Sequence, residues 1–390
     1  MRGRIIKRKG SNNYTIVLQL GLDPSTGKRK QQWITAGSSK REAEKHMAKL
    51  INDLDNGSYI KPDKTTVASY LEGWLKDYVW PSLSPRTAEG YESIVRCHLI
   101  PALGSVPLGQ LKPEHLQHYY SEKLSGGRFN DKGTLSQTTV SHHHTCIHRA
   151  FKMALKSGLI SRNPADAVTP PRPQHSEMHT MTEDDLNTFL EATKETPYYV
   201  LFYMALFTGM RRSELLALRW SDLDLLLCQV RVTRSLHHLR TGEIVFRATK
   251  TAKARRMVSL PPSAALLLQE YKDKQEAQRA TLGISLKEDD LVFSNFEGQP
   301  LLPDTISHAW TKLVKRTGLK GIRLHDARHT HASLLLKQSV HPKIVQERLG
   351  HATISTTLDL YSHISPGLQE AAAIGFDKLI NRSEKDAIRK

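Results

Sequence analysis

Four side chains with the chemistry to bind and cleave a phosphodiester lie between residues 325 and 361. They are the imidazoles of His325 and His351, the guanidinium of Arg328 and the phenol of Tyr361. His325 and Arg328 are three positions apart, so a helix would place them on one face. A guanidinium can hold two phosphate oxygens in a fork, imidazoles can donate hydrogen bonds or move protons, and a phenol can attack phosphorus. The set therefore favours phosphoryl transfer.

Two cations earlier in the chain supply what this set lacks. Arg211 follows Thr-Gly-Met at an expected helix start, where the glycine permits a sharp turn. Lys250 follows an expected strand in a hairpin, from which a flexible ammonium can reach a phosphodiester oxygen. Lys253 lies in the same hairpin and stays an alternative to Lys250. In chain order, the candidate catalytic residues are Arg211, Lys250, His325, Arg328, His351 and Tyr361.

Two histidine patterns raise the alternative of a metal site. His325 and His329 have the spacing of two zinc ligands on a helix, but Asp326 stands where zinc proteases of the H-E-x-x-H type carry glutamate. No third ligand is evident. Residues 142–144 are all histidine, yet adjacent helical residues point about 100° apart and cannot all bind one ion. A polar, mildly basic helix face is expected there, and no metal ligand is predicted.

The charge balance points to a polyanionic partner. The 390 residues include 56 Lys and Arg against 39 Asp and Glu, which gives a net charge of +17 and a pI near 9.7. This excess favours nucleic acid first and an anionic membrane surface second. The longest apolar run, 198–207, is far shorter than the roughly 20 residues that span a bilayer. Three scattered cysteines without a C-x-x-C pair fit a reducing compartment, so a cytoplasmic DNA-binding protein outside the membrane is expected.

The first unit expected from the pattern, residues 1–63, is a small α+β domain with a three-stranded sheet on one helix. Residues 14–20 alternate as a half-buried strand does, residues 23–27 are a turn sequence, and residues 28–35 indicate the returning strand. Ser39 and Glu42 form a capping box at a helix start. With 13 Lys and Arg against 6 Asp and Glu, this sheet could enter a DNA groove. The alternative is a solvated basic face.

The rest of the chain predicts mainly helical units. In residues 64–168 a small bundle of four helices is expected, with helix starts near Thr66, Ser84, Lys112 and Ser136 and a last helix that ends at Gly158. The Pro-rich residues 169–180 predict a linker. Residues 181–390 predict a mainly α unit with a small antiparallel sheet. Its helices would begin near Thr182, Pro197, Pro262 and Asp304, and its strands would be 228–233, 244–249 and 257–260.

Together, these motifs resemble the tyrosine recombinase (phage integrase) family over essentially the whole chain. The matching stretches are TGMRRSELLAL at 208–218, the hairpin lysine, HDARHTHAS at 325–333, LGH at 349–351 and LYSH at 360–363. The resemblance implies a three-domain integrase. Residues 1–63 would bind arm-type DNA sites, residues 64–168 would bind core sites, and residues 181–390 would form the catalytic domain.

The family implies a role for each matching residue. Tyr361 would be the nucleophile that gives a 3′-phosphotyrosine and a free 5′-hydroxyl. Arg211 and Arg328 would clamp the scissile phosphate and stabilise charge on its oxygens in the transition state. Lys250 would act as the general acid toward the leaving 5′-oxygen. A phenol whose pKa is near 10 needs such neighbours to react at neutral pH.

Three further residues would support the reaction. His325 would assist proton transfer around the tyrosine, His351 would donate to a phosphate oxygen, and Glu214 matches an acidic position that would buttress the site. The phosphotyrosine would conserve the energy of the phosphodiester. Neither ATP, a metal nor another cofactor is therefore expected.

The resemblance also implies an assembly on double-stranded DNA. A homotetramer would exchange one strand pair, pass through a Holliday junction and exchange the second pair, which would integrate or excise a phage or another mobile element. An excisionase and a host DNA-bending protein would be further partners in a bacterial cytoplasm. The apolar residues 368–380 would form a helix lent to a neighbouring protomer, and the alternative is that they pack on their own domain.

Two other classes of protein use parts of the same pattern. Type IB topoisomerases share the Tyr/Arg/Lys/His chemistry but relax supercoils as monomers, and the arm-like first unit argues against that class. A non-catalytic DNA-binding protein would explain the net charge without a role for Tyr361. Dependence on two defined sites would exclude a topoisomerase, and loss of cleavage with retained binding in Tyr361→Phe would exclude the non-catalytic class.

Overall fold

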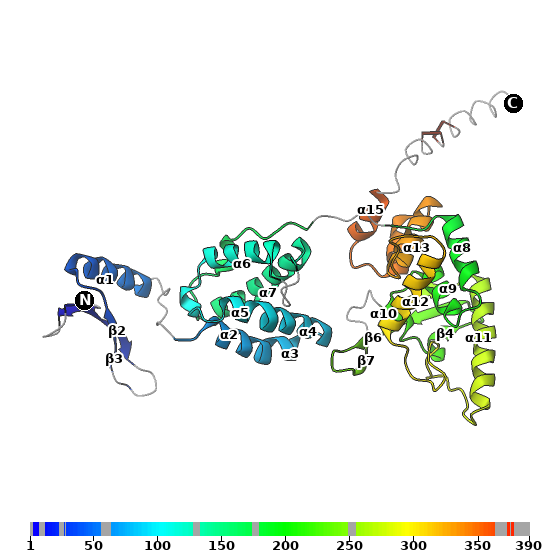
Figure 1. Ribbon diagram of the computed structural model, residues 1–390, viewed down its shortest axis with the longest axis horizontal. Helices are drawn as coiled ribbons and strands as arrows, with labels where there is room; N and C mark the ends of the chain where they lie inside the picture. The colour runs from blue at the N-terminus through cyan, green and yellow to red at the C-terminus, as the bar shows by residue number, and fades with distance from the viewer. Residues whose placement is uncertain are drawn as a thin grey trace, which may run out of the picture. The chain divides into compact units, whose positions relative to one another are not determined.

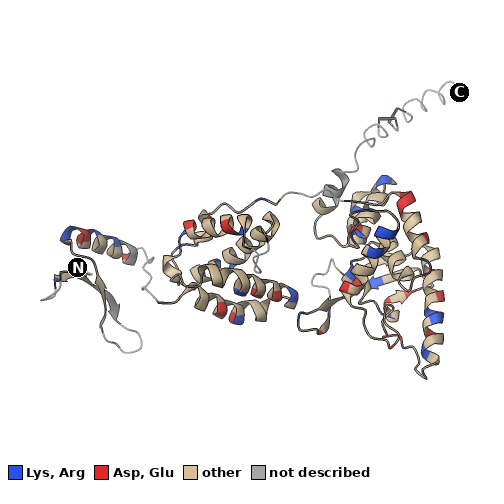
Figure 2. Cartoon of the chain, in the orientation of Figure 1, with Lys and Arg blue, Asp and Glu red and all other residues tan. Residues whose placement is uncertain are grey.

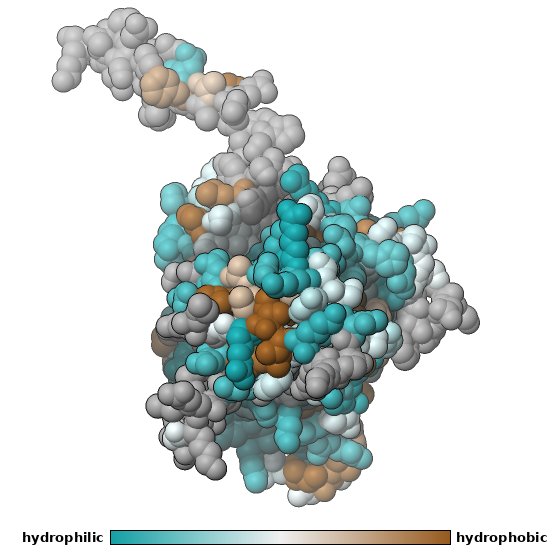
Figure 3. Space-filling model, turned by 90° about the vertical axis from the view of Figure 1, so that its left-hand side faces the viewer, coloured by the Kyte–Doolittle hydropathy of each residue, from teal (hydrophilic) through white to brown (hydrophobic). Residues whose placement is uncertain are grey.

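The computed structural model describes residues 3–7, 12–22, 27, 29–55, 64–127, 133–173, 179–248, 255–362, 373–374 and 376–377. The chain divides into two compact units, Met1–His175 and Ser176–Lys390. They are mainly helical and contain small antiparallel sheets (Figure 1), so the predicted fold class is confirmed. Among the described residues no helix is long and apolar enough to cross a bilayer. On the face drawn in Figure 3, hydrophobic residues form small patches among hydrophilic ones.

Three antiparallel strands and one helix come first in the chain. β1 (Gly3–Lys7), β2 (Tyr14–Leu22) and β3 (Arg29–Thr35) pair in that order, and α1 (Lys40–Asp55) packs against β1 and β2. Ile16 and Leu18 are fully buried, and a Cβ at Gly3 would lie 3.4 Å from Met47 of α1. Basic and acidic residues are interspersed along α1 (Figure 2). Both expected strands are confirmed, while most of the expected turn 23–27 lies outside the described residues.

The other helices of the first unit enclose a separate core. They are α2 (Val67–Trp74), α3 (Trp80–Ser82), α4 (Pro85–Ile94), α5 (Ile100–Leu103), α6 (Pro113–Ser125) and α7 (Gln137–Lys156), with π turns η1 (Leu75–Val79) and η2 (Val95–Leu99) and 3-10 turns η3 (Leu108–Gln110) and η4 (Pro164–Ala167). The π turns join α2 to α3 and α4 to α5, so the described residues contain the four expected helices. Gly158, at φ 69°, lies just after α7 where a stop was expected.

Each π turn precedes a proline inside its helix. The Trp80 N–H donates to the Leu75 carbonyl, five residues back, and the Ile100 N–H donates to the Val95 carbonyl in the same way. Pro81 and Pro101 follow directly. Proline has no N–H to donate, and its ring crowds the preceding turn. The wider turn relieves that crowding and lets both helices continue past their prolines.

The expectation of a polar, basic face at residues 142–144 is wrong for two of the three histidines. His143 is 1% exposed and its Nδ1 lies 2.8 Å from the Tyr119 hydroxyl, while His144 pairs with the Tyr120 hydroxyl at 2.9 Å. Burial, aided by the charges of His98 and Lys123, lowers the pKa of His143 to about 4. These histidines are therefore neutral hydrogen-bond partners for buried tyrosines, which helical periodicity alone could not reveal.

The second unit packs helices around two small sheets. Its elements are α8 (Glu183–Thr193), α9 (Tyr199–Thr208), α10 (Arg212–Leu215), the 3-10 turn η5 (Trp220–Asp222), β4 (Leu223–Asp224), β5 (Gln229–Val232), β6 (Arg234–His238), β7 (Ile244–Ala248), β8 (Arg256–Ser259), α11 (Pro262–Ala280), α12 (Pro303–Arg316), α13 (Asp326–Lys337), α14 (Pro342–Leu349) and α15 (Ser355–Ser362). Thr182 caps α8 through a capping box with Asp185, as expected. The fully buried Trp310 packs with its ring centroid 4.4 Å from Phe189 and 5.2 Å from Phe202, which joins α12, α8 and α9.

The single sheet expected in this unit is in fact two. Strands β4, β5 and β8 form one sheet, and β6 and β7 form a separate hairpin. Strand β6 was not predicted, because its residues RSLHH lack a clear apolar alternation. Arg234 anchors this strand, since its Nε donates to the Ala217 carbonyl at 2.8 Å and its guanidinium lies 4.6 Å from the ring centroid of Phe246.

The pKa of His143 predicts an acid-sensitive bundle. An unfolded histidine titrates near pH 6.5 and folded His143 near 4, so its stabilising contribution is complete above about pH 6.5 and is lost as the pH falls toward 4. His143→Gln should cost about 1 kcal/mol at pH 7.5 through the disturbed bond to Tyr119. It should also flatten the loss of stability on acidification, as measured by calorimetry between pH 7.5 and 4.5. The matched control His142→Gln replaces an exposed histidine of the same helix and should leave the pH dependence unchanged.

Candidate active site

Arg328 lies in α13 and is held almost entirely by main-chain oxygens. It is 3% exposed, and its Nη1 and Nη2 donate to the carbonyls of Gly209 at 2.9 Å and Leu349 at 2.6 Å. Burial and then the positive charge of Arg211 lower the pKa of Arg328 to about 9. The guanidinium is therefore still charged at neutral pH, in a setting that would favour an additional negative charge.

The C-terminal end of α14 receives three different arginines. The consecutive carbonyls of residues 348, 349 and 350 accept from Arg256 Nε at 2.7 Å, Arg328 Nη2 at 2.6 Å and Arg211 Nη2 at 3.4 Å. Carbonyls at the end of a helix lack intrahelical partners, and they carry the negative end of the helix dipole. The helix end thus gathers cations without neutralising them.

Two glycines in the left-handed conformation make this arrangement possible. Gly350, at φ 67°, ends α14 and turns the chain toward His351, and a Cβ there would lie 3.1 Å from Arg256 Cδ. Gly209, at φ 63°, ends α9, and a Cβ there would lie 2.5 Å from Leu349 Cδ2. The TGM and LGH motifs therefore need glycine both for backbone conformation and for space.

Glu214 links Arg211 to Arg256. Its buried carboxylate accepts Arg211 Nη1 at 2.7 Å and Arg256 Nη1 and Nη2 at 3.2 and 2.8 Å, and it also accepts the Arg211 main-chain N–H at 3.0 Å. Burial alone would raise the pKa of Glu214, but the hydrogen bond and charge of Arg256 and the charge of Arg211 lower it below its usual value. Glu214 is therefore ionised and fixes both guanidinium groups, as the expected buttressing role requires.

The histidines around these arginines favour the neutral form. Burial and the charges of Arg328 and Arg211 lower the pKa of His351 to about 4, and its Nδ1 lies 2.9 Å from the hydroxyl of the buried Thr357. His325, at the start of α13, keeps an exposed edge, and partial burial followed by the charges of His329 and Arg328 lowers its pKa. A neutral imidazole can accept a proton at one nitrogen and donate a hydrogen bond from the other, which suits the roles expected of both.

Two residues behind the arginines, the half-buried Arg348 and the buried His331, were not predicted. Arg348 donates to His331 Nε2 at 2.9 Å and to the carbonyls of Ser259 at 3.0 Å and Phe207 at 3.0 Å. Burial and the charge of Arg348 lower the pKa of His331 to about 3, so it accepts that bond as a neutral ring. Arg348 lies in the ERLGH stretch and His331 in the HTHAS stretch, but no local sequence pattern indicated that the two side chains contact each other. Arg256, just after the expected hairpin, was overlooked for the same reason.

The structure brings four of the six candidate residues together. The charges of Arg211 and Arg328 are close enough to His325 and His351 to lower the pKa of both histidines, and the charge of Arg211 also lowers the pKa of Arg328. Tyr361 lies in α15, which packs against α13 and α14, but its side chain is outside the described part of the chain. Lys250 and its alternative Lys253 lie outside the described residues as well.

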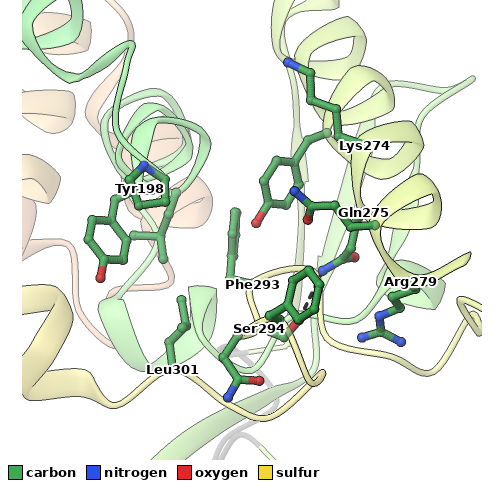
Figure 4. A pocket seen from close by; sticks show the side chains of 13 residues that line it. Tyr198, Lys274, Gln275, Arg279, Phe293, Ser294 and Leu301 are labelled. Atoms are coloured by element: carbon green, nitrogen blue, oxygen red, sulfur yellow. Dashed lines mark hydrogen bonds between the residues drawn. The ribbon is translucent and has the colours of Figure 1, made fainter. Parts of the chain in front are cut away.

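Two other kinds of functional site, a metal site and a ligand cavity, have less support than the arginine cluster. Of the residues that the structure describes, no group of three or more His, Cys, Asp or Glu could hold a metal ion. A cavity of about 410 Å³ opens between the start of α9 and α11, lined by Tyr198, Lys274, Gln275 and Phe293 among others (Figure 4). Gln275 is occupied there by Ser294 Oγ at 3.1 Å and Trp220 Nε1 at 2.8 Å. None of the four candidates whose side chains the structure describes lines this cavity.

Comparison with known proteins identifies the family to which this chain belongs. Residues 179–367 match the model of the phage integrase family, and residues 66–124 match a phage integrase N-terminal SAM-like domain. The chain belongs to the phage integrase family of tyrosine recombinases. A XerC-like tyrosine recombinase of Caldanaerobacter subterraneus is 26% identical over 92% of this chain and 94% of its own. The ICEBs1 integrase of Bacillus subtilis is also 26% identical, over 96% of this chain and 100% of its own.

Solved structures agree on the fold. The Tn1549 transposon integrase in complex with a circular intermediate DNA superposes with a TM-score of 0.66 at 20% identity, over 81% of this chain and 99% of that one. A lambda integrase dimer bound to a core site gives a TM-score of 0.57 at 19% identity, over 91% and 93% of the two chains. At this level of identity, the likeness supports the architecture alone.

The packing of Gly209 predicts a steric cost at this site. Gly209→Ala should destabilise the protein by about 1–2 kcal/mol for left-handed backbone strain, and by about 1–3 kcal/mol more for the clash with Leu349 and His331. Gly158→Ala is the matched control, because its φ of 69° is similar but no atom lies within 4 Å of its added Cβ. Urea unfolding of both variants should show the larger loss for Gly209→Ala, and equal losses would contradict the packing.

Proposed function

We propose that this tyrosine recombinase cleaves and rejoins DNA through attack of the Tyr361 hydroxyl on a phosphodiester. The P–O bond to the 5′-oxygen breaks as a 3′-phosphotyrosine forms, and Lys250 gives its proton to the leaving oxygen. Arg211 and Arg328 hold the non-bridging oxygens, His325 assists proton movement at the tyrosine, and His351 donates to the phosphate. Attack by a 5′-hydroxyl reverses the step, so the bond energy is conserved and no ATP is needed.

The observation that carries this proposal is the arginine cluster around the end of α14. Arg211, Arg256 and Arg328 converge there, and the acidic partner among the described residues is Glu214. A phosphodiester adds the missing negative charge, and the transition state adds more charge on the same oxygens. Arg211, whose side chain is 37% exposed, is the member open to such a ligand.

We assign the DNA contacts to three parts of the chain. The catalytic domain is residues 181–390, and the Pro-rich linker 169–180 connects it to residues 64–168, which bind core sites. Arm sites are bound by residues 1–63. The exposed face of the first sheet supports the last assignment, since Arg4 and Trp33 flank Val17 across its strands and Trp33 is 47% exposed. Such a face can meet DNA through charge and through contact with the bases.

We further propose that the protein acts as a tetramer on DNA and integrates and excises a mobile element. Integrases of transposons, integrative elements and phages are among its relatives, and a lambda integrase tetramer bound to a Holliday junction shares the fold at a TM-score of 0.53. Residues 368–380 would dock on a neighbouring protomer. A directionality factor and a host DNA-bending protein would complete the assembly in a bacterial cytoplasm.

The nucleophile can be tested with a nicked duplex from which the cleaved fragment diffuses away. The wild-type protein should form a covalent adduct with a core-site duplex in the absence of ATP and divalent metal, and mass spectrometry should place the DNA on Tyr361. Tyr361→Phe should abolish the adduct but still bind the duplex. The control Tyr198→Phe, in the distant cavity, should react as the wild type does. An adduct on another tyrosine would overturn the assignment.

DNA binding should weaken steeply with salt because contacts to phosphates release counterions. For roughly six to ten phosphate contacts, affinity should fall by about 10³- to 10⁵-fold between about 50 and 200 mM salt. Fluorescence anisotropy on a core-site duplex measures this slope. A flat response would contradict a binding surface built from the excess of 17 positive charges.

A further inference from the structure

Arg256 is a buried arginine for which the reaction proposed above has no role. It is the first residue of β8, and its side chain is only 6% exposed. Its three guanidinium nitrogens donate to Glu214 and to the Arg348 carbonyl. Because these bonds face inward, Arg256 is poorly placed to hold a phosphate itself. Any effect on the reaction must pass through its partners.

Arg256 and Arg211 share the carboxylate of Glu214 unequally. Arg256 takes both oxygens in a fork, with Nη1 at 3.2 Å from Oε1 and Nη2 at 2.8 Å from Oε2. The Arg211 side chain has one bond to Oε1, at 2.7 Å, and Oε2 is further engaged by the Arg211 main-chain N–H at 3.0 Å. Both oxygens are thus in use. The Arg211 guanidinium also donates to the Gly350 carbonyl, but this bond is long at 3.4 Å.

We propose that Arg256 is a positioning residue that saturates Glu214 and so keeps the Arg211 guanidinium available to the scissile phosphate. This inference rests on the function proposed above. Paired arginine and carboxylate groups prefer a two-bond fork. Without Arg256, the buried carboxylate would be left with one cation, and it would turn both oxygens toward Arg211. Arg211 would then be withdrawn from the substrate, and the cluster would lose one positive charge.

The effect of Glu214 on the cleavage rate should depend on whether Arg256 is present. While Arg256 is present, Glu214 holds both guanidinium groups in place, so Glu214→Gln should slow cleavage. Once Arg256 is gone, Glu214 becomes a competitor of the phosphate, so the same substitution should speed cleavage. Because Arg256 and Glu214 are in contact, their effects on stability are themselves expected to couple. The change of sign must therefore appear in the single-turnover rate of fully folded, DNA-saturated variants, where a loss of stability alone does not slow cleavage.

The test is a double-mutant cycle of Arg256→Gln and Glu214→Gln, read as the single-turnover cleavage rate of the nicked duplex at saturating protein. Arg256→Gln should slow cleavage by about 100-fold, the order expected when a charge-stabilising group is lost from a transition state. Adding Glu214→Gln should then restore at least about tenfold. Arg279→Gln is the matched control, since Arg279 is also buried and paired with a carboxylate, that of Asp290, but lies in α11 beside the distant cavity.

The outcomes separate the inference from the function it rests on. Unchanged cleavage by Arg256→Gln, or a double variant no faster than Arg256→Gln, would overturn the positioning role while the wild-type adduct at Tyr361 stands. Absence of that adduct would overturn the proposed function instead. Circular dichroism and retained DNA binding show that the variants are folded. Arg256→Lys supplies a second reading if Arg256→Gln does not fold, because it keeps the charge but loses the fork, and its rate should be intermediate. A Lys variant as fast as the wild type would also overturn the role.

Discussion

The second unit packs several guanidinium groups into one buried region. Its stability depends on offsetting the repulsion between their positive charges. The structure meets this constraint mainly with main-chain oxygens. Three successive carbonyls at the end of α14 accept from three arginines that come from β8, the start of α10 and α13. One ionised carboxylate, Glu214, ties two of them together. Carbonyl dipoles satisfy the donors but leave their charge in place, so the region still attracts an anion.

The same excess of charge decides the state of the surrounding imidazoles. Protonating His351 would place another cation beside Arg328 and Arg211, so its pKa falls to about 4. His331 is held neutral behind the cluster, where it accepts a bond from Arg348. A bound phosphodiester would reverse this balance, because its negative charge favours protonation of nearby rings. In the proposed reaction, proton transfer at this site would therefore be coupled to the binding of the phosphodiester.

Much of the fold and of the site could be predicted from local pattern. Helix starts at Thr182 and Pro262 and the strands of the first sheet follow from capping residues and periodicity, and residue type with spacing singled out Arg211, His325, Arg328 and His351. The missed features depend on contacts between distant segments. Arg256 and Glu214 are 42 positions apart, His143 pairs with a tyrosine on another helix, and β6 is defined by its partner strand rather than by its own alternation. Nothing in one stretch of sequence carries such information.

The paired π turns of the bundle have a consequence for how its helices compare between relatives. A π turn holds one residue more than an α turn, so every side chain after η1 or η2 is rotated by about 100° from its place in a regular helix. Trp80 and Leu103 thus owe their orientation to an extra residue upstream. A relative with a regular α-helix here must be one residue shorter to keep the same face buried. In a sequence alignment with such relatives, a gap of one residue before Pro81 or Pro101 would then indicate a change of helical register and not a change in the length of a loop.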